Sequence, residues 1–203
     1  MSRFLQHLGS HLLCAVDTET TGTKPGLHEI IQIAIIPLDH DLKPDANRFP
    51  FILDMRPERI DDIDYEAMRV NRRTLSELMI SAVDKYRAQD LFLEWFERQK
   101  LATYKRIIPV ASNWPFDRSF IMDWLGPETY ELTFSSHYRD TMILAAFMND
   151  RASWRAEPTQ FHHCDLSSLC QKFGIDRGAA HDAAADAVAT AEVYKHLIQG
   201  FYP

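Results

Sequence analysis

Short apolar runs and helix-spaced apolar stripes alternate along this chain, and turn-forming residues separate them. The run from Leu12 to Val16 is continuously apolar and ends at Asp17, which is typical of a buried central strand. Thr20 to Gly26 is predicted to form a turn because of its glycines and proline, and the isoleucine-rich segment Glu29 to Leu38 predicts a second strand, hairpin-connected to the first. Further strands are predicted at Phe49 to Leu53, at Arg106 to Ser112 and, in a short form, around Ser135 to Arg139.

Helical spacing dominates the rest of the chain. Asp61 to Leu78 mixes short helical patterns, and its start, Asp61 to Asp64, is expected to be a solvated loop with a helix cap. Ala82 to Gln99 predicts a longer amphipathic helix. The helix presents Val83, Leu91, Trp95 and Phe96 as apolar residues. The stripe that is most simply interpreted as core consists of Leu91, Phe92, Trp95 and Phe96. The other predicted helices run from Pro115 to Gly126-Pro127, from Thr141 to Asn149, from a cap at Asp165 to Phe173 with Gly174 closing it, and from Asp182 to Ile198, with a loop at Arg151 to Gln160.

The order of these elements indicates the fold class. Strands come first and then alternate with helices, so we expect an α/β fold with a mixed sheet and helices on both faces. No repeat, low-complexity segment or linker divides the chain, so a single domain over residues 1–203 is expected. The chain stops a few residues after the last predicted helix, so no polymerase-docking tail is expected.

Composition narrows the class of protein. Apolar residues make up 46% and charged residues 25% of the 203 positions, an ordinary globular balance. No run approaches the roughly 20 apolar residues of a membrane helix, so no membrane association is expected. Met1 to His7 lacks the apolar core and cleavage site of a signal peptide, and three cysteines cannot all pair. We therefore expect a cytoplasmic protein.

The net charge of −7 argues against a broad electrostatic grip on duplex nucleic acid. Part of the negative excess belongs to the acidic residues described next, where bound cations would reverse the local field. The charge therefore favours a short, metal-dependent contact with the end of a nucleic-acid strand.

Four acidic residues and one histidine form the most informative pattern in the sequence. Asp17 and Glu19 stand two apart at a strand end, so that both side chains leave the same face. Asp117 lies near the start of a helix, Asp186 lies one turn into the last helix, and His181 is expected on the loop before it. Isolated carboxylates beside apolar stretches are costly, whereas a shared Mg²⁺ or Mn²⁺ ion stabilises them. Two such ions about 4 Å apart can clamp a phosphodiester, and a histidine can accept the proton of the attacking water.

Three sequence runs carry a resemblance to a known family. They are Asp17-Thr18-Glu19-Thr20-Thr21-Gly22, Asn113-Trp114-Pro115-Phe116-Asp117 and Ala180-His181-Asp182-Ala183-Ala184-Ala185-Asp186-Ala187. In order and spacing they resemble the three motifs of the DEDDh (DnaQ-like) 3′–5′ exonucleases, which include polymerase proofreading subunits, ribonuclease T and oligoribonucleases. Ile30 to Ala34 resembles the family's second strand, and Asp140-Thr141 the start of its late helix. The resemblance implies a ribonuclease H-like fold with a five-stranded mixed sheet flanked by helices on both faces.

The resemblance also implies roles for the five residues. Asp17 would bridge two divalent cations, Mg²⁺ or Mn²⁺; Glu19 and Asp186 would complete the hydrolytic ion, Asp117 would serve the second, and His181 would be the general base. The implied reaction is 3′–5′ hydrolysis of phosphodiester bonds at the 3′ end of single-stranded DNA or RNA, releasing nucleoside 5′-monophosphates.

Residues around the first two motifs are expected to contact substrate. The expected contacts are Thr18, Thr20, Thr21, Asn113, Trp114 and Phe116. Trp114-Pro115 departs from the family, whose members often carry small residues there; Trp114 either packs in the core or stacks on a base.

Several alternatives stay open at this point. A catalytically silent, exonuclease-fold accessory module of a polymerase complex is the second functional hypothesis, and free-standing relatives are often homodimers. Arg69, Arg72 and Arg73 form either a solvated helix face or a basic patch that guides a strand towards the site. His162-His163-Cys164 with Cys170 matches no common zinc spacing and is interpreted as an ordinary approach to a helix.

Overall fold

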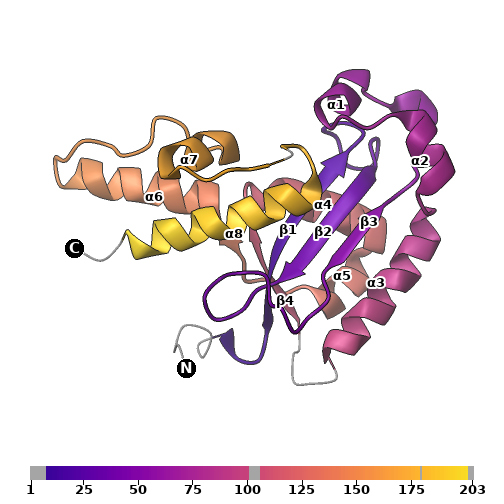
Figure 1. Cartoon of the computed structure of the whole chain (residues 1–203), viewed down its shortest axis with the longest axis horizontal. Coiled ribbons are helices and arrows are strands. Elements are labelled where there is room, and N and C mark those ends of the chain that lie inside the picture. Colours follow the sequence, from indigo (N-terminus) through magenta and orange to yellow (C-terminus); the bar gives the residue numbers. More distant parts are fainter. Residues whose placement is uncertain (1–7, 101–105, 179, 201–203) are drawn as a thin grey trace.

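A five-stranded mixed sheet forms the centre of the computed structural model, which describes residues 8–100, 106–178 and 180–200 (Figure 1). Its strand order is β3-β2-β1-β4-β5. β1 pairs antiparallel with β2 and parallel with β4, β2 pairs antiparallel with β3, and β4 pairs parallel with β5. The strands are β1 (Leu12–Thr20), β2 (Ile30–Pro37), β3 (Phe51–Asp54), β4 (Ile107–Ala111) and β5 (Arg139–Asp140). The predicted mixed sheet and β1–β2 hairpin are confirmed; Met1 to His7, used above against a signal peptide, lies outside the described residues.

Alternating side chains of β1 supply both faces of this sheet. Leu12, Cys14 and Val16 belong to one hydrophobic core, which includes residues of α3 (Lys85–Lys100), α4 (Trp114–Leu125) and α5 (Pro127–Thr133). Leu13 and Ala15 belong to another, whose helical partner is α8 (Ala183–Gln199). Figure 1 shows α8 crossing the sheet, with α6 (Thr141–Trp154) and α7 (Leu166–Phe173) beside it. Helices therefore cover both faces, as expected.

The segment between β3 and α3 lies at the end of the sheet towards which β1 runs (Figure 1). It contains a 3₁₀ turn (Ile60–Asp62), α1 (Tyr65–Val70) and α2 (Leu75–Ser81). Asp64 caps α1, and Thr74 with Glu77 forms a capping box at α2. This segment is tied to β1, because the Asn71 side-chain amide donates to the Thr20 carbonyl over 2.9 Å.

The structure corrects several predicted boundaries. α3 begins at Lys85 rather than Ala82, because the Asp84 carboxylate accepts from the amides of Tyr86 and Arg87; Val83 instead pairs with Met55 as an isolated bridge. The last strand is Arg139–Asp140, later than the predicted Ser135 to Arg139.

Two helices were missed or cut short in the sequence analysis. Gly126 adopts a φ of 78°, which turns the chain between α4 and α5, and Pro127 starts the unpredicted α5. α6 continues to Trp154, so residues Arg151 to Trp154 are helical and not loop. The predicted caps at Asp165 and Asp182 are confirmed. Among the described residues, no helix combines the length and apolar character needed to cross a membrane.

Candidate active site

The far end of β1 supplies two carboxylates to one face of the sheet. Asp17 and Glu19 continue the Leu13–Ala15 series that faces α8, and a register irregularity between Glu19 and Thr20 ends the regular pairing. Thr18 points the other way, towards the start of α4. Because side chains alternate along a strand, the carboxylates of Asp17 and Glu19 lie on one side of β1 and the Thr18 hydroxyl lies on the other.

Asp117 reaches the same region from the first turn of α4. Its Oδ1 accepts hydrogen bonds from the backbone amide (2.9 Å) and hydroxyl (2.8 Å) of Thr18. The start of α4 is set by Asn113, which has a left-handed φ of 67°, and by Asp140, whose carboxylate accepts from the Trp114 amide over 2.8 Å. These contacts hold Asp117 beside β1 although it lies 99 residues after Thr18.

Asp186 and His181 complete the constellation from the start of α8. One ligand atom each of Glu19, His181 and Asp186 lies within 4.8 Å of the others, a spacing at which all three could bind one ion. His181 lies on the segment before α8, as predicted, with a left-handed φ of 65°. Its backbone amide donates to Asp186 Oδ2 over 3.2 Å.

Arg177 already places a positive charge on this cluster. Its Nε donates to Asp186 Oδ1 over 2.9 Å, and its Nη2 donates to Asp186 Oδ2. Its Nη1 donates to Ser167 in α7. The Arg177 guanidinium thus provides a positive partner for the buried carboxylate of Asp186.

Burial and mutual repulsion keep the carboxylates from ionising freely. The pKa of Asp17 lies well above its ordinary value, first because of burial and then because of Asp117, Glu19 and Asp186. Burial, followed by the charges of Asp186 and Asp117, raises the pKa of Glu19 to about 8. Burial raises the pKa of Asp117 to about 7, although both bonds from Thr18 oppose the shift. Three of these crowded carboxylates, those of Asp17, Glu19 and Asp117, have raised pKa values. Such a set of oxygen donors fits hard divalent cations, because these ions restore the ionised state.

Comparison with known proteins identifies the family. A family model described as Exonuclease matches residues 14–194. The chain belongs to this exonuclease family. The resemblance to the DEDDh group is therefore confirmed, and this exonuclease-family chain carries all five expected motif residues. No curated protein sequence matches the chain.

Solved structures share the fold. The cell-death related nuclease CRN-4 superposes with a TM-score of 0.73 at 14% identity, over 95% of this chain and 65% of that one. E. coli exonuclease I in complex with a dT13 oligonucleotide gives 0.70 at 20% identity, over 92% of this chain and 41% of that one. The nuclease domain of 3′hExo, a DEDDh family member bound to rAMP, gives 0.66 at 16% identity, over 95% and 94%. The exonuclease-family chain thus spans well under two thirds of the exonuclease I chain, and these likenesses establish the ribonuclease H-like fold.

The expected substrate contacts divide into accessible and internal groups. Asn113 is exposed and Phe116 is half-buried, and both flank Asp117. The Thr20 hydroxyl donates to the Gly22 carbonyl, and the Thr21 hydroxyl accepts from the Glu29 amide, so both are engaged internally.

Trp114 belongs to the core. Its side chain is 1% exposed and packs against Phe134 with ring centroids 6.0 Å apart. Of the two alternatives left open by the sequence, core packing is therefore correct and base stacking is not.

The basic triplet from the sequence analysis is split by the fold. Arg69 pairs with Glu66 on the surface, Arg73 pairs with Asp54 and Asp182, and Arg72 is exposed with a left-handed φ of 54°. Arg69 and Arg72 are both exposed, and of these two Arg72 lies beside the candidate site. It lines an open cavity of about 420 Å³ together with Asn71, Arg73 and His181.

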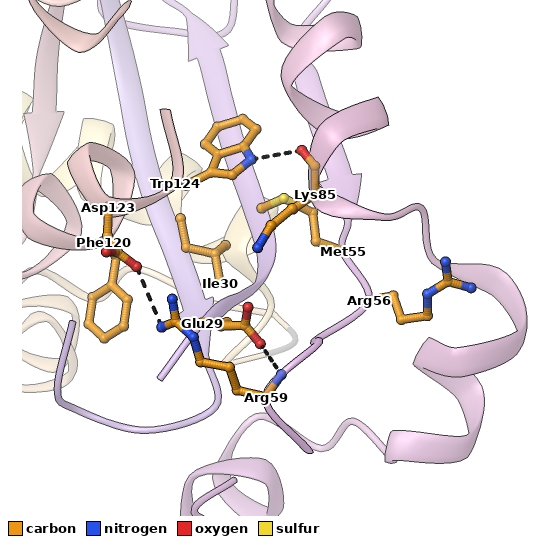
Figure 2. A pocket seen from close by; sticks show the side chains of 9 residues that line it. All are labelled: Glu29, Ile30, Met55, Arg56, Arg59, Lys85, Phe120, Asp123 and Trp124. Carbon is orange, nitrogen blue, oxygen red and sulfur yellow. Dashed lines mark hydrogen bonds and ion pairs between the residues drawn. The ribbon is translucent and has the colours of Figure 1, made fainter. Parts of the chain in front are cut away.

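A second cavity, of about 80 Å³, lies on the α3/α4 face and is lined by three basic residues (Figure 2). Arg59 reaches Asp123 with its guanidinium, and its backbone amide donates to Glu29. Lys85 pairs with Glu58, and Figure 2 shows the Arg56 guanidinium pointing away from the cavity. Two of its three cations are paired and the third is turned outward, so this cavity offers no concentrated positive field.

Sequence reasoning missed the role of Arg177. It placed Asp140 at the start of a late helix, which is confirmed, but not its contact with the start of α4. A single arginine in a polar loop nine residues before Asp186 resembles a solvated charge, and only the fold places it on the cluster. Among the described residues, the other cluster with metal-ligand spacing is the exposed turn Asp39-His40-Asp41, and His162, His163 and Cys164 form none.

Proposed function

We propose that this chain is a divalent-cation-dependent 3′–5′ exonuclease that releases nucleoside 5′-monophosphates from the 3′ end of single-stranded DNA or RNA. The observation that carries the proposal is the convergence of Asp17, Glu19, Asp117, Asp186 and His181 at the end of β1. Family membership supports it, because these residues occupy the three motifs of the DEDDh exonucleases.

The four carboxylates are the proposed ligands of two Mg²⁺ or Mn²⁺ ions. Asp17 would be shared between both ions, Glu19 and Asp186 would hold one, and Asp117 would serve the other. When bound, the ions would supply an activated water and neutralise charge on the phosphate. The raised pKa values of Glu19 and Asp117 support this assignment, because a cation is what would keep those groups ionised at neutral pH.

His181 is the proposed general base. Its imidazole stands within 4.8 Å of ligand atoms of Glu19 and Asp186, at the mouth of an open cavity. In the proposed reaction a water oxygen bonds to the last phosphorus while the bond to the 3′ oxygen of the preceding nucleotide breaks. His181 takes the proton of the water, and the departing 3′ oxygen keeps the bonding electrons and takes up a proton from solvent. The products are a nucleoside 5′-monophosphate and a strand shortened by one nucleotide.

The terminal nucleotide would lie between the start of α4 and the segment before α8. Asn113 and Phe116 are the proposed contacts on the α4 side, and the segment at the end of β1 that contains Thr18, Thr20 and Thr21 is proposed to lie near the 3′ hydroxyl. A net charge of −7 supports recognition of a strand end rather than of a long duplex. Both DNA and RNA are proposed, since the structural neighbours include a complex with a DNA oligonucleotide and one with rAMP.

We also propose that the enzyme acts in a reducing compartment such as the cytoplasm. Cys14, Cys164 and Cys170 are free thiols. Burial raises the pKa of Cys170 to about 11, which supports an inert structural role in its core.

The decisive experiment is digestion of matched 5′-labelled single-stranded DNA and RNA with Mg²⁺, Mn²⁺ or EDTA. We expect a ladder that shrinks from the 3′ end with either metal and disappears in EDTA. Asp186→Asn is the matched contamination control, because it keeps the side-chain shape and removes one ligand charge. A folded wild-type protein that cleaves neither substrate with either metal would favour the accessory-module hypothesis, and an Asp186→Asn protein with full activity would refute the assignment.

A further inference from the structure

Arg73 connects two segments that are far apart in the sequence. It lies between α1 and α2, and its guanidinium donates to Asp54 Oδ2 at the end of β3 (3.1 Å) and to Asp182 Oδ2 before α8 (3.2 Å). The Arg73 side chain is 26% exposed and each carboxylate about one third exposed, so these are partly enclosed ion pairs. Both ends of its guanidinium are therefore engaged by the protein.

Gln32 of β2 belongs to the same hydrogen-bond network. Its side-chain Nε2 donates to Asp54 Oδ1 over 2.9 Å and to Asp182 Oδ2 over 3.4 Å. Its Oε1 accepts from the backbone amide of Ala183 over 2.8 Å. Gln32 is 4% exposed, so the network rests on the buried centre of the sheet.

The network ends at the residue that follows His181. Asp182 is the N-cap of α8: its Oδ1 accepts from the amides of Ala184 and Ala185, while its Oδ2 receives Arg73 and Gln32. His181 holds a left-handed φ of 65°, a conformation that persists in a non-glycine residue only where its surroundings enforce it. Asp182 therefore fixes the backbone from which the imidazole projects.

We propose that Arg73 is a positioning residue that holds the His181 backbone through Asp182, so that the imidazole stays against Glu19 and Asp186. This inference rests on the proposed role of His181 as general base. Arg73 also lines the open cavity beside His181, but both terminal nitrogens of its guanidinium already donate to carboxylates, which favours a role within the protein over binding of a phosphate. Arg69, whose partner is Glu66 on the surface, is the matched control within the same basic triplet.

Steady-state kinetics on a 5′-labelled oligonucleotide test the proposal. Arg73→Ala is expected to lower kcat about 10- to 100-fold, the usual cost of losing a group that orients a first ligand or base, with KM changed less than about twofold. Arg73→Lys should recover part of kcat, and Arg69→Ala should leave both constants unchanged. A rise in KM with kcat unchanged would overturn the proposal, since it would make Arg73 a substrate contact.

A double-mutant cycle separates positioning from general loss of structure. In a His181→Ala background, adding Arg73→Ala should change kcat less than about twofold, because the group being positioned is gone. The same 10- to 100-fold loss in both backgrounds would overturn the proposal. Asp54→Asn, which weakens the network at its other end, serves as the second variant if Arg73→Ala fails to fold.

A measurement that does not depend on catalytic activity separates the test of this inference from the test of the proposed function. Arg73→Ala should shift the His181 imidazole resonances and speed amide exchange at Ala183 to Ala185, whereas Arg69→Ala should do neither. If the wild type cleaves nothing but these shifts occur, the proposed function fails and the positioning geometry stands. Unmoved His181 resonances in Arg73→Ala would refute the positioning itself.

Discussion

Arg177 holds Asp186 with two nitrogens of its guanidinium, so that both oxygens of this nearly buried carboxylate face one arginine. Asp186 is also a proposed cation ligand. A divalent ion must therefore share Asp186 with Arg177 or displace it, and the third contact of Arg177, to Ser167, gives the arginine an alternative anchor in α7.

Removing this arginine should change metal affinity in the absence of substrate. We expect Arg177→Gln to bind Mn²⁺ roughly 10-fold more tightly, because about 1.4 kcal/mol of competition is enough for that factor and charge-assisted pairs commonly reach it. Calorimetry or electron paramagnetic resonance titration of Mn²⁺ measures it, with Arg177→Lys as the charge-retaining control. Weaker binding in Arg177→Gln would instead mean that Arg177 orients Asp186 for the ion.

Stability of the metal-free protein should fall as pH rises. Glu19 and Asp117, with pKa values raised to about 8 and about 7, bind protons in the folded state that the unfolded chain releases near pH 4. For each proton that only the folded state retains, the free energy of unfolding falls by up to about 1.4 kcal/mol for every unit that the pH rises, between pH 4.5 and the pKa of the folded state. Urea unfolding in EDTA from pH 5 to 8.5 tests the slope.

Two controls belong to that titration. Glu19→Gln should flatten the slope, because one titrating group is removed, and Mg²⁺ should restore stability most at the alkaline end. A metal-free protein that becomes more stable from pH 5 to 8 would contradict the raised pKa values.

Replacing Asp17 by asparagine should separate activity from stability. Asp17 is repelled by Asp117, Glu19 and Asp186, so Asp17→Asn is expected to raise the unfolding temperature at pH 8 in EDTA. The same change removes the ligand proposed to bridge both ions, and we expect turnover to fall at least about 100-fold. Thermal unfolding and the labelled-strand assay, run on one preparation, check both; retained turnover would exclude the bridging role.

His181→Ala should affect the reaction but not cation binding. Loss of a general base typically costs about 10²- to 10⁴-fold in rate. Mn²⁺ affinity should stay within about threefold of wild type, since the four carboxylates remain. An undiminished rate would remove His181 from the proposed chemistry, and lost Mn²⁺ binding would make it a ligand.

Thr18 should tune the pH dependence through Asp117. Thr18→Val keeps the shape and the backbone amide bond but removes the hydroxyl that donates to Asp117 Oδ1. Because this bond favours the ionised carboxylate, its loss should raise the pKa of Asp117 and move the acidic limb of the activity profile up by about one pH unit. Thr18→Ser retains a hydroxyl and should leave the limb in place; a downward shift would contradict the role given to this bond.

Local patterns were sufficient to predict the centre of the fold. β1 begins with a continuous apolar run and β2 is rich in isoleucine. Asp165 and Asp182 cap their helices through contacts within three residues. The motif residues at the end of β1 and the start of α8 were visible for the same reason. The position of each motif residue on its own strand or helix could be predicted from the residues next to it in the sequence.

Long-range contacts explain what the sequence concealed. Trp114 is a residue type that can stack on a base, and only its packing against Phe134 shows that it belongs to the core. Arg73 and Arg177 are single arginines in polar segments, and their partners lie on other elements. Val83 fits the apolar stripe of α3 but is excluded from the helix by the cap at Asp84.

The contacts that hold the candidate site together also determine at which stage of folding the site can form. Thr18 and Asp117 are 99 positions apart, Arg73 and Asp182 are 109 apart, and Gln32 and Ala183 are 151 apart. Such distant pairings form late, because the entropy of closing large loops opposes them until much of the fold is in place. A ribosome-bound chain that has not yet released α8 holds Asp17 and Glu19 without His181 and Asp186. The candidate site is thus assembled only when α8 has packed against β1 and β2, and a partly folded chain with an intact sheet still lacks it.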